Sequence, residues 1–366
     1  TSLISYGNYQ KLVSNDFLLK AILRLIIIGK SDLIQWFDSI LKIQNQILLQ
    51  TITNPSHPKF NHFLFESISF LVKYCCFNNQ DTYQIAERLL FPTIQIVLRD
   101  DVTEFVPYVF QLLSLLLYLI PLEQLTSTNS GFCQLLTHVI HPSIWSIPTN
   151  ISALVKFLFT FILRYPTFVS NNYINQIMGI IQMLLKSKNN DLNGLLLWNC
   201  LVKNLPFSQI EPFLKPMTVL VLTKLQSPSK SIRSTRIATL FTANLIVNIA
   251  NENSAQVWFA LMESIQVGIT GSFITGVLIK DALMLVDQDE KLLLFFTLAK
   301  ITPLVPTLTC ELVFCMAGLV QVSPHLTDPI IDNLNELEQE INDQSVTNAV
   351  NEADQESGVT GTSLAS

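Results

Sequence analysis

Apolar residues recur at helical spacing along almost the whole chain. Between residues 60 and 75, one apolar face is formed at positions i, i+3, i+4, i+8, i+11, i+12 and i+15 by Phe60, Phe63, Leu64, Ile68, Leu71, Val72 and Cys75. This is the pattern of one face of an α-helix. An opposing polar stripe is formed by Asn61, Glu66, Ser69 and Lys73. Phe65 and Phe70 lie off both stripes, which predicts that the helix is covered on two sides.

Turn-like stretches interrupt this pattern at regular intervals, at residues 54–58, 78–81, 99–101, 126–131, 187–191 and 227–229. Asp101 with Glu104, and Ser208 with Glu211, have the spacing of capping boxes. The breaks leave about fifteen helices, hence seven or eight pairs, and one pair per about 40–47 residues is the period of HEAT or armadillo repeats. The sequence therefore predicts an all-α HEAT-repeat solenoid over residues 1–341, a right-handed superhelix of antiparallel helix pairs.

The C-terminal end has a different composition. Residues 301–366 carry ten acids and no Lys or Arg, whereas residues 1–300 carry 18 acids and 22 bases. Residues 342–366 also lack apolar periodicity. They are predicted to form a disordered acidic tail, while the body before them is mildly basic.

The overall composition leaves two architectures open. Hydrophobic residues make up 49% of the chain, charged residues only 14%, and the mean hydropathy is +0.40. A solenoid has this composition because each helix packs on its partner and on the neighbouring repeats. A polytopic membrane protein is the alternative, but its best window, residues 105–122, contains two prolines besides Gln111 and Ser114. We therefore expect no membrane insertion, and the first residues show no signal-peptide pattern.

The six cysteines form no CxxC pair, and all but Cys310 lie in apolar surroundings: Cys75, Cys76, Cys133, Cys200 and Cys315. They are predicted to be buried, reduced thiols, as in proteins of the cytosol or nucleus.

No catalytic or cofactor motif stands out. A phosphate-binding loop, a dinucleotide fingerprint and a nucleophile elbow are all missing from the sequence. His138 and His141 share a helical face, but no suitably spaced Asp or Glu completes a zinc site. We expect no enzyme activity, no cofactor and no metal.

Two features are candidates for protein binding. Lys230, Arg233 and Arg236 are spaced by three on one predicted helix, and no acid occurs between Glu211 and Glu252. This stripe is either a solvated helix face or a contact for an acidic partner, and reversing its three charges is expected to leave the fold intact.

The second candidate is the polar loop of residues 54–62, with His57, Lys59 and Asn61. Nucleic acid is not favoured, because the body is only mildly basic and has no recognition-helix motif.

Four segments, in the same order, resemble the exportin-2 family, the CAS-type receptors of the importin-beta superfamily: residues 15–24, residues 54–66 (NPSHPKFNHFLFE), residues 101–117 (beginning DVTEFVPYVFQ), and residues 187–206. The resemblance extends from about Asn15 to about Phe241. It implies a HEAT superhelix that is not an enzyme and that binds importin-alpha together with the GTP form of Ran. It also implies passage through nuclear pore proteins, shuttling between nucleus and cytoplasm, and correspondence of this chain to the C-terminal part of such a receptor. A generic HEAT-repeat scaffold is the alternative.

Overall fold

The described part of the chain is helical throughout. The computed structural model describes residues 16–120, 131–226, 232–249, 253–282, 284–285 and 287–319. Within these ranges every regular element is a helix, as predicted for an all-α protein. The predicted acidic tail, 342–366, lies outside the described residues. The chain divides into two compact units, 1–317 and 318–366, and the second is described only at its first two residues.

The elements up to residue 164 are α2 (Asp16–Gly29), the 3-10 helix η1 (Lys30–Trp36), α3 (Phe37–Ile52), α4 (Pro58–Cys76), α5 (Gln80–Arg99), α6 (Val106–Leu119), α7 (Gly131–Val139), the 3-10 helix η3 (Pro142–Ser146) and α8 (Pro148–Arg164). They are followed by α9 (Pro166–Asn172), α10 (Ile174–Lys186), α11 (Asp191–Asn204), α12 (Phe207–Leu225), α13 (Ile232–Asn248) and α14 (Ser254–Ile265). The last are α15 (Ile269–Phe273), a π-helical turn η4 (Ile274–Leu278), α16 (Ile279–Ala282), α17 (Gln288–Ile301), the 3-10 turns η5 (Thr302–Leu304) and η6 (Pro306–Leu308), and α18 (Thr309–Leu319).

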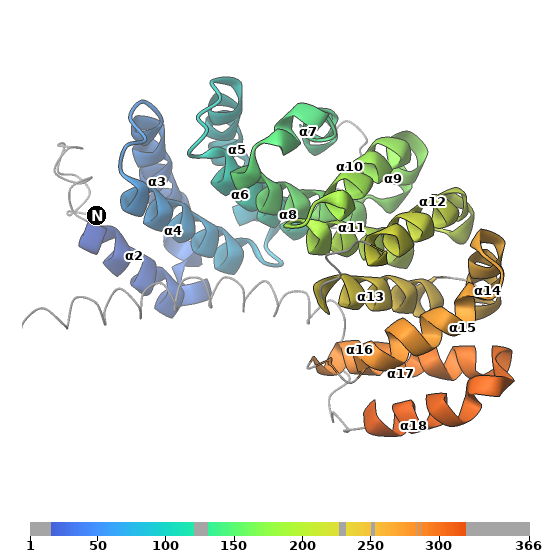
Figure 1. The fold of residues 1–366 in the computed structure, drawn as a ribbon. Coiled ribbons are helices and arrows are strands. Elements are labelled where there is room, and N and C mark those ends of the chain that lie inside the picture. The colour runs from blue at the N-terminus through green and yellow to red at the C-terminus, as the bar shows by residue number, and fades with distance from the viewer. Residues whose placement is uncertain are drawn as a thin grey trace, which may run out of the picture. The chain divides into compact units, whose positions relative to one another are not determined.

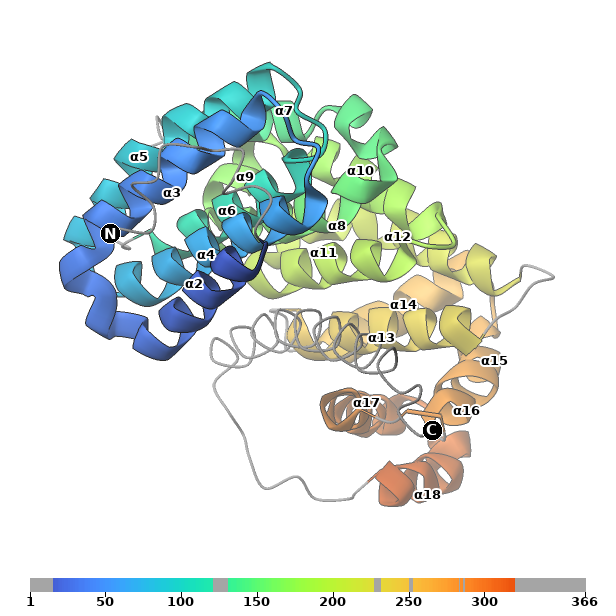
Figure 2. The same cartoon turned by 90° about the vertical axis from the view of Figure 1, so that its left-hand side faces the viewer.

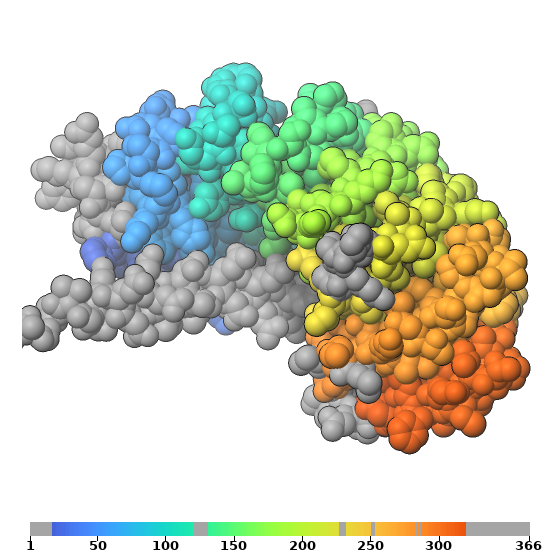
Figure 3. Space-filling model, in the orientation of Figure 1, coloured from blue at the N-terminus to red at the C-terminus, as the bar shows by residue number. Residues whose placement is uncertain are grey.

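The helices of unit 1–317 stack in two layers (Figures 1 and 2). In the first layer, each helix packs on the next in the order α2, α4, α6, α8, α11, α13 and α17. In the second layer, α3 packs on α5, and α10 packs on α12, which packs on α14. Successive helices along the chain therefore alternate between layers, and Figure 3 shows their side chains as adjoining bands of colour. This alternation is the arrangement of a helical-repeat solenoid.

Helix α4 shows how the apolar pattern becomes packing. Phe60, Leu64 and Ile68 are completely buried, as its apolar face predicts. Phe65 and Phe70 are also buried, which confirms that the helix is covered on two sides. The Phe65 ring stacks on Tyr108 of α6 with centroids 4.9 Å apart. The contact joins neighbouring helices of the first layer.

Helix starts differ from the sequence expectation at two places. Helix α6 begins after Phe105 and α12 after Pro206, in both cases without a side-chain cap, so the two predicted capping boxes are wrong. Asp101 instead has φ of 49° in the turn before α6. A side-chain cap is present at α5, where Asn79 accepts a hydrogen bond from the Thr82 amide at 3.2 Å.

Cys75, Cys76, Cys133 and Cys200 are buried and unbridged, as predicted, and burial raises the pKa of Cys75 to about 11. Cys310 is exposed and Cys315 is half-buried, so the predicted burial is wrong for these two thiols. No single helix in the described ranges is long and apolar enough to cross a bilayer. Two helix pairs reach the necessary length and composition together, but they are bent by 103° at Tyr165 and by 107° before Ile269.

Candidate protein-interaction sites

The loop before α4 is organised by Asn61. Its Nδ2 donates to the Pro55 carbonyl at 2.9 Å, and its backbone N–H donates to the His57 carbonyl at 3.0 Å. Asn61 is only 2% exposed, so its place in the predicted polar stripe, and in a contact surface, is wrong. His57 and Lys59 are exposed beside a shallow hollow of about 150 Å³. Asn61 thus fixes the loop from inside, while His57 and Lys59 remain candidates for binding.

Replacing Asn61 by alanine is expected to lower the free energy of unfolding by about 1–2 kcal/mol, because the Pro55 carbonyl loses its side-chain donor. Urea unfolding followed by circular dichroism measures this. His57→Ala is the control: its side chain caps no helix, and its effect should stay within about 0.5 kcal/mol. An Asn61→Ala protein as stable as the His57→Ala protein would contradict the role of this bond.

A cluster on α4 and α6 lies next to this loop. The His62 Nε2 is 3.4 Å from the Glu66 carboxylate, and the His62 ring is 6.1 Å from the Tyr108 ring. Burial raises the pKa of Glu66, while the charge of His62 acts in the opposite direction. The one carboxylate on the exposed side of α4 is therefore partly withdrawn from solvent and paired with a histidine.

Of the predicted basic stripe, the structure describes Arg233 and Arg236, whereas Lys230 lies outside the described residues. The Nε of Arg233 donates to the Asp191 carboxylate at 2.7 Å. Lys224 donates to the other oxygen of Asp191 at 2.6 Å. The Asp191 side chain is 3% exposed, so one buried carboxylate joins α11, α12 and α13.

The other described arginine is also paired. Arg236 on α13 donates to Glu290 on α17 at 2.6 Å, and this hydrogen bond raises the pKa of Arg236. The sequence predicted that these cations form a stripe without nearby acids, and the structure corrects this. Arg233 is paired with Asp191, 42 residues away in the chain, and Arg236 with Glu290, 54 residues away. Neighbouring positions in the sequence do not reveal Asp191 and Glu290 for this reason. Contact of the stripe with a partner protein stays a prediction.

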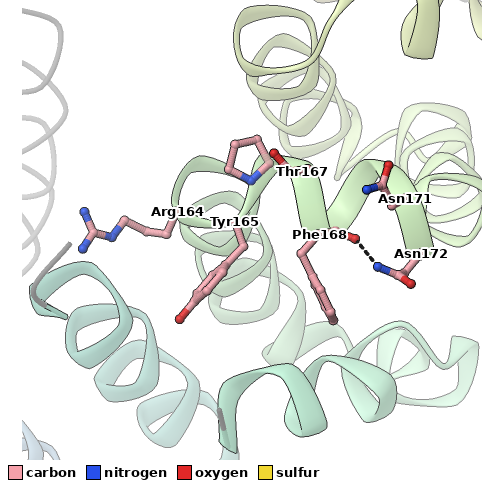
Figure 4. Close-up of a pocket in the computed structure, with 7 residues that line it drawn as sticks. Arg164, Tyr165, Thr167, Phe168, Asn171 and Asn172 are labelled. Atoms are coloured by element: carbon pink, nitrogen blue, oxygen red, sulfur yellow. Dashed lines mark hydrogen bonds between the residues drawn. The ribbon is translucent and has the colours of Figure 1, made fainter. Parts of the chain in front are cut away.

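A surface hollow of about 340 Å³ lies at the bend between α8 and α9 (Figure 4). Its polar side chains do not converge. Asn172 donates to the Phe168 carbonyl of its own helix, and Arg164 points away from Asn171 and Asn172 and donates to the Ile120 carbonyl. No group of three or more His, Cys, Asp or Glu side chains in the described ranges is arranged to hold a metal.

The two stacked layers define the class: this is a HEAT-repeat α-solenoid, in which helix pairs present extended surfaces to other proteins. The chain belongs to the CAS/CSE family, because residues 3–365 match the family described as "CAS/CSE protein, C-terminus". This agrees with the resemblance seen in the sequence.

The similarities to individual relatives agree with this family assignment. The chain is 31% identical over 322 residues to the "Importin-alpha re-exporter" of Schizosaccharomyces pombe, covering 87% of this chain and 32% of that protein. It is 33% identical over 216 residues to "Exportin-2" of Danio rerio, covering 58% of this chain and 22% of the relative. The solved structure "The exportin Cse1 in its cargo-free, cytoplasmic state" matches with a TM-score of 0.75 and 22% identity, covering 90% of this chain and 36% of that one. The chain thus spans about a third or less of these relatives.

Proposed function

We propose that the protein acts as the C-terminal HEAT arm of a nuclear export receptor, which carries importin-alpha from the nucleus to the cytoplasm in complex with Ran-GTP. The observation that carries the proposal is the family match over residues 3–365, together with a relative named for importin-alpha re-export that aligns with 87% of the chain. In this role the protein is a binding protein without catalysis, meets nuclear pore proteins, and shuttles between the two compartments.

The fold suits such a role. Each helix pair packs mainly on its neighbours, so the free side of a layer remains available along its length. The described surface hollows are small or lack convergent polar groups, whereas the loop at His57 and Lys59 is held in place from inside by Asn61. These features support recognition of a folded protein.

The test is retention of importin-alpha by a tagged receptor in which this chain replaces the corresponding C-terminal part of the Schizosaccharomyces pombe relative. Purified importin-alpha is offered with Ran locked in the GTP form or loaded with GDP. We expect retention with the GTP form and loss with the GDP form. The relative's own full-length protein is the positive control, and the same receptor ending before the joined chain is the negative control.

Equal retention with both forms of Ran, while the positive control distinguishes them, would contradict the proposal. It would favour a general HEAT-repeat scaffold without a link to Ran. A fluorescent fusion of the protein is expected in both the nucleus and the cytoplasm, and exclusion from the nucleus would contradict the proposed shuttling.

A further inference from the structure

Three carboxylates surround one guanidinium where α16 and α17 pack on α13 (Figure 1). Arg236 on α13 donates to Glu290 on α17 at 2.6 Å, and this hydrogen bond raises the pKa of Arg236. The nearby carboxylates of Asp287, at the start of α17, and Asp281, on α16, raise the same pKa further. The three acids are called here the carboxylate cluster. Apart from the pair of Arg236 with Glu290, no lysine or arginine in the described ranges forms an ion pair with them.

The three carboxylates are stabilised unequally. Glu290 accepts from Arg236, and Asp287 accepts from the backbone N–H groups of Asp289 and Glu290 at 2.9 and 3.0 Å. The Oδ2 atom of Asp281 has no donor, although Asp281 is only 2% exposed. A buried carboxylate oxygen without a donor has lost its water and gained no hydrogen bond in return. The negative charge is therefore least favourable on Asp281.

The helices around Asp281 offer it no free cation. On α13, Arg236 is bonded to Glu290 and Arg233 to Asp191. The turn η4, which packs on α16, contains no ionisable residue.

Lysines of its own helix and of α17 do not pair with Asp281 either. Lys280 of α16 is exposed, and neither Lys280 nor Lys291 of α17 forms an ion pair with it in the structure. Burial raises the pKa of Asp281 above its ordinary value. The charge of Glu290 acts in the same direction, whereas Thr239 and the charge of Arg236 lower the pKa.

A proton on Asp281 would relieve both difficulties of the cluster. It removes the buried charge and leaves two carboxylates, in place of three, around Arg236. It also adds an O–H donor next to a second unsatisfied group, because Oε2 of Glu290 is buried without a hydrogen-bond partner. A donor and an acceptor that satisfy each other cost less to bury than two unpaired carboxylate oxygens.

We propose that Asp281 is a proton-dependent switch for the packing of α16 and α17 on α13, which tightens when Asp281 gains a proton and loosens when it loses one. This goes beyond the proposed function, because it assigns a conformational control to the fold whether or not the protein carries importin-alpha. The folded-state pKa of Asp281 lies above the unfolded-state value. Its contribution to stability is therefore complete below the unfolded-state value and is lost as the pH rises through the folded-state value.

The test is hydrogen exchange of the whole chain, with protection factors corrected for the intrinsic effect of pH. Asp281→Asn removes the buried charge and keeps the shape of the side chain. At pH 7.5 it should raise the protection of the α16 amides severalfold, and this gain should shrink as the pH is lowered towards 5. Asp289→Asn is the matched control, because it changes the net charge equally at an exposed position in the first turn of α17. Its effect should be less than about twofold at both pH values.

A second variant, Arg236→Gln, distinguishes the charge of the cluster from its packing. In the unmodified chain it should lower the protection of α16 and α17 severalfold, because the carboxylates lose their cation. In the Asp281→Asn chain the loss should be smaller, because one carboxylate fewer remains without a partner.

Three outcomes would overturn the proposal: an Asp281→Asn chain that is unfolded or less protected than the unmodified chain, a gain in protection that is equal at both pH values, or an equal loss from Arg236→Gln in both backgrounds. Circular dichroism of each variant establishes whether it is folded. Because importin-alpha and Ran are not part of this assay, its failure is distinguishable from failure of the proposed export function.

Discussion

Replacement of Gly194 by valine is expected to be among the most destabilising single changes in the chain. A β-carbon at this position would lie 2.8 Å from both Cγ and the backbone nitrogen of Leu185 and 3.1 Å from Cβ of Leu184. The backbone of α10 cannot move aside locally, so α10 and α11 would have to separate. We expect a loss of about 3 kcal/mol in the free energy of unfolding, the upper range for overpacking.

The matched control is Gly179→Val on α10. Gly179 is exposed, and a β-carbon there meets no atom within 4 Å. Because glycine is a poorer helix former than valine, this change should raise stability by a few tenths of a kcal/mol, about the difference in helix propensity. Urea midpoints of the two variants provide the comparison. Equal midpoints would show that the approach of α10 to α11 does not depend on Gly194.

Replacement of Asp191 by alanine is expected to lower the free energy of unfolding by about 3 kcal/mol. The change removes the carboxylate that pairs with Lys224, whose side chain is only 18% exposed. Lys224 also donates to the carbonyls of Leu185 and Ser187 at 2.8 and 3.2 Å at the end of α10. The loop between α10 and α11 should loosen together with the ion pair. Chemical unfolding and hydrogen exchange of this loop measure both effects.

The partner variants separate the contributions to this cluster. Arg233→Gln should cost less than about 1 kcal/mol, because the Arg233 side chain is 42% exposed and screened by solvent. The double variant Asp191→Ala, Lys224→Met should recover part of the loss, because no unpaired charge remains buried. If Asp191→Ala lowered the free energy of unfolding no more than Arg233→Gln, burial of the Asp191 carboxylate would not contribute to stability. Reversal of Arg233 and Arg236 to glutamate is now expected to destabilise the fold, contrary to the expectation from sequence.

The helical array was predictable because its signal is local. The apolar face of residues 60–75 is enough to predict α4 and its burial, and the breaks at residues 54–58 and 78–81 bound that helix within two residues of its observed ends. Phe65 and Phe70 even predicted that neighbours cover two sides. Helix starts were less predictable. The capping boxes expected at Asp101 and Ser208 do not form, because α6 begins after Phe105 and α12 begins after Pro206.

The candidate sites depended on contacts that no local pattern contains. From its position in the helix, Asn61 was predicted to lie on the exposed polar stripe. In the structure the loop before α4 folds back, and the Asn61 side chain donates a hydrogen bond to the Pro55 carbonyl. Arg233 and Arg236 look unpaired until α11 and α17 bring Asp191 and Glu290 to them.

The order of helices within the layers also determines how the protein unfolds. Since the main packing partners of each described helix are near neighbours along the chain, stability is a sum of local interfaces, and no single centre holds the whole array. Unfolding can therefore be local: loss of the interface between α10 and α11 separates the two layers in that part of the array and leaves α4 with its own neighbours α2, α5 and α6. Amide protons of α4 should therefore outlast those of α11 in a Gly194→Val protein, and unfolding transitions followed at the two places should separate.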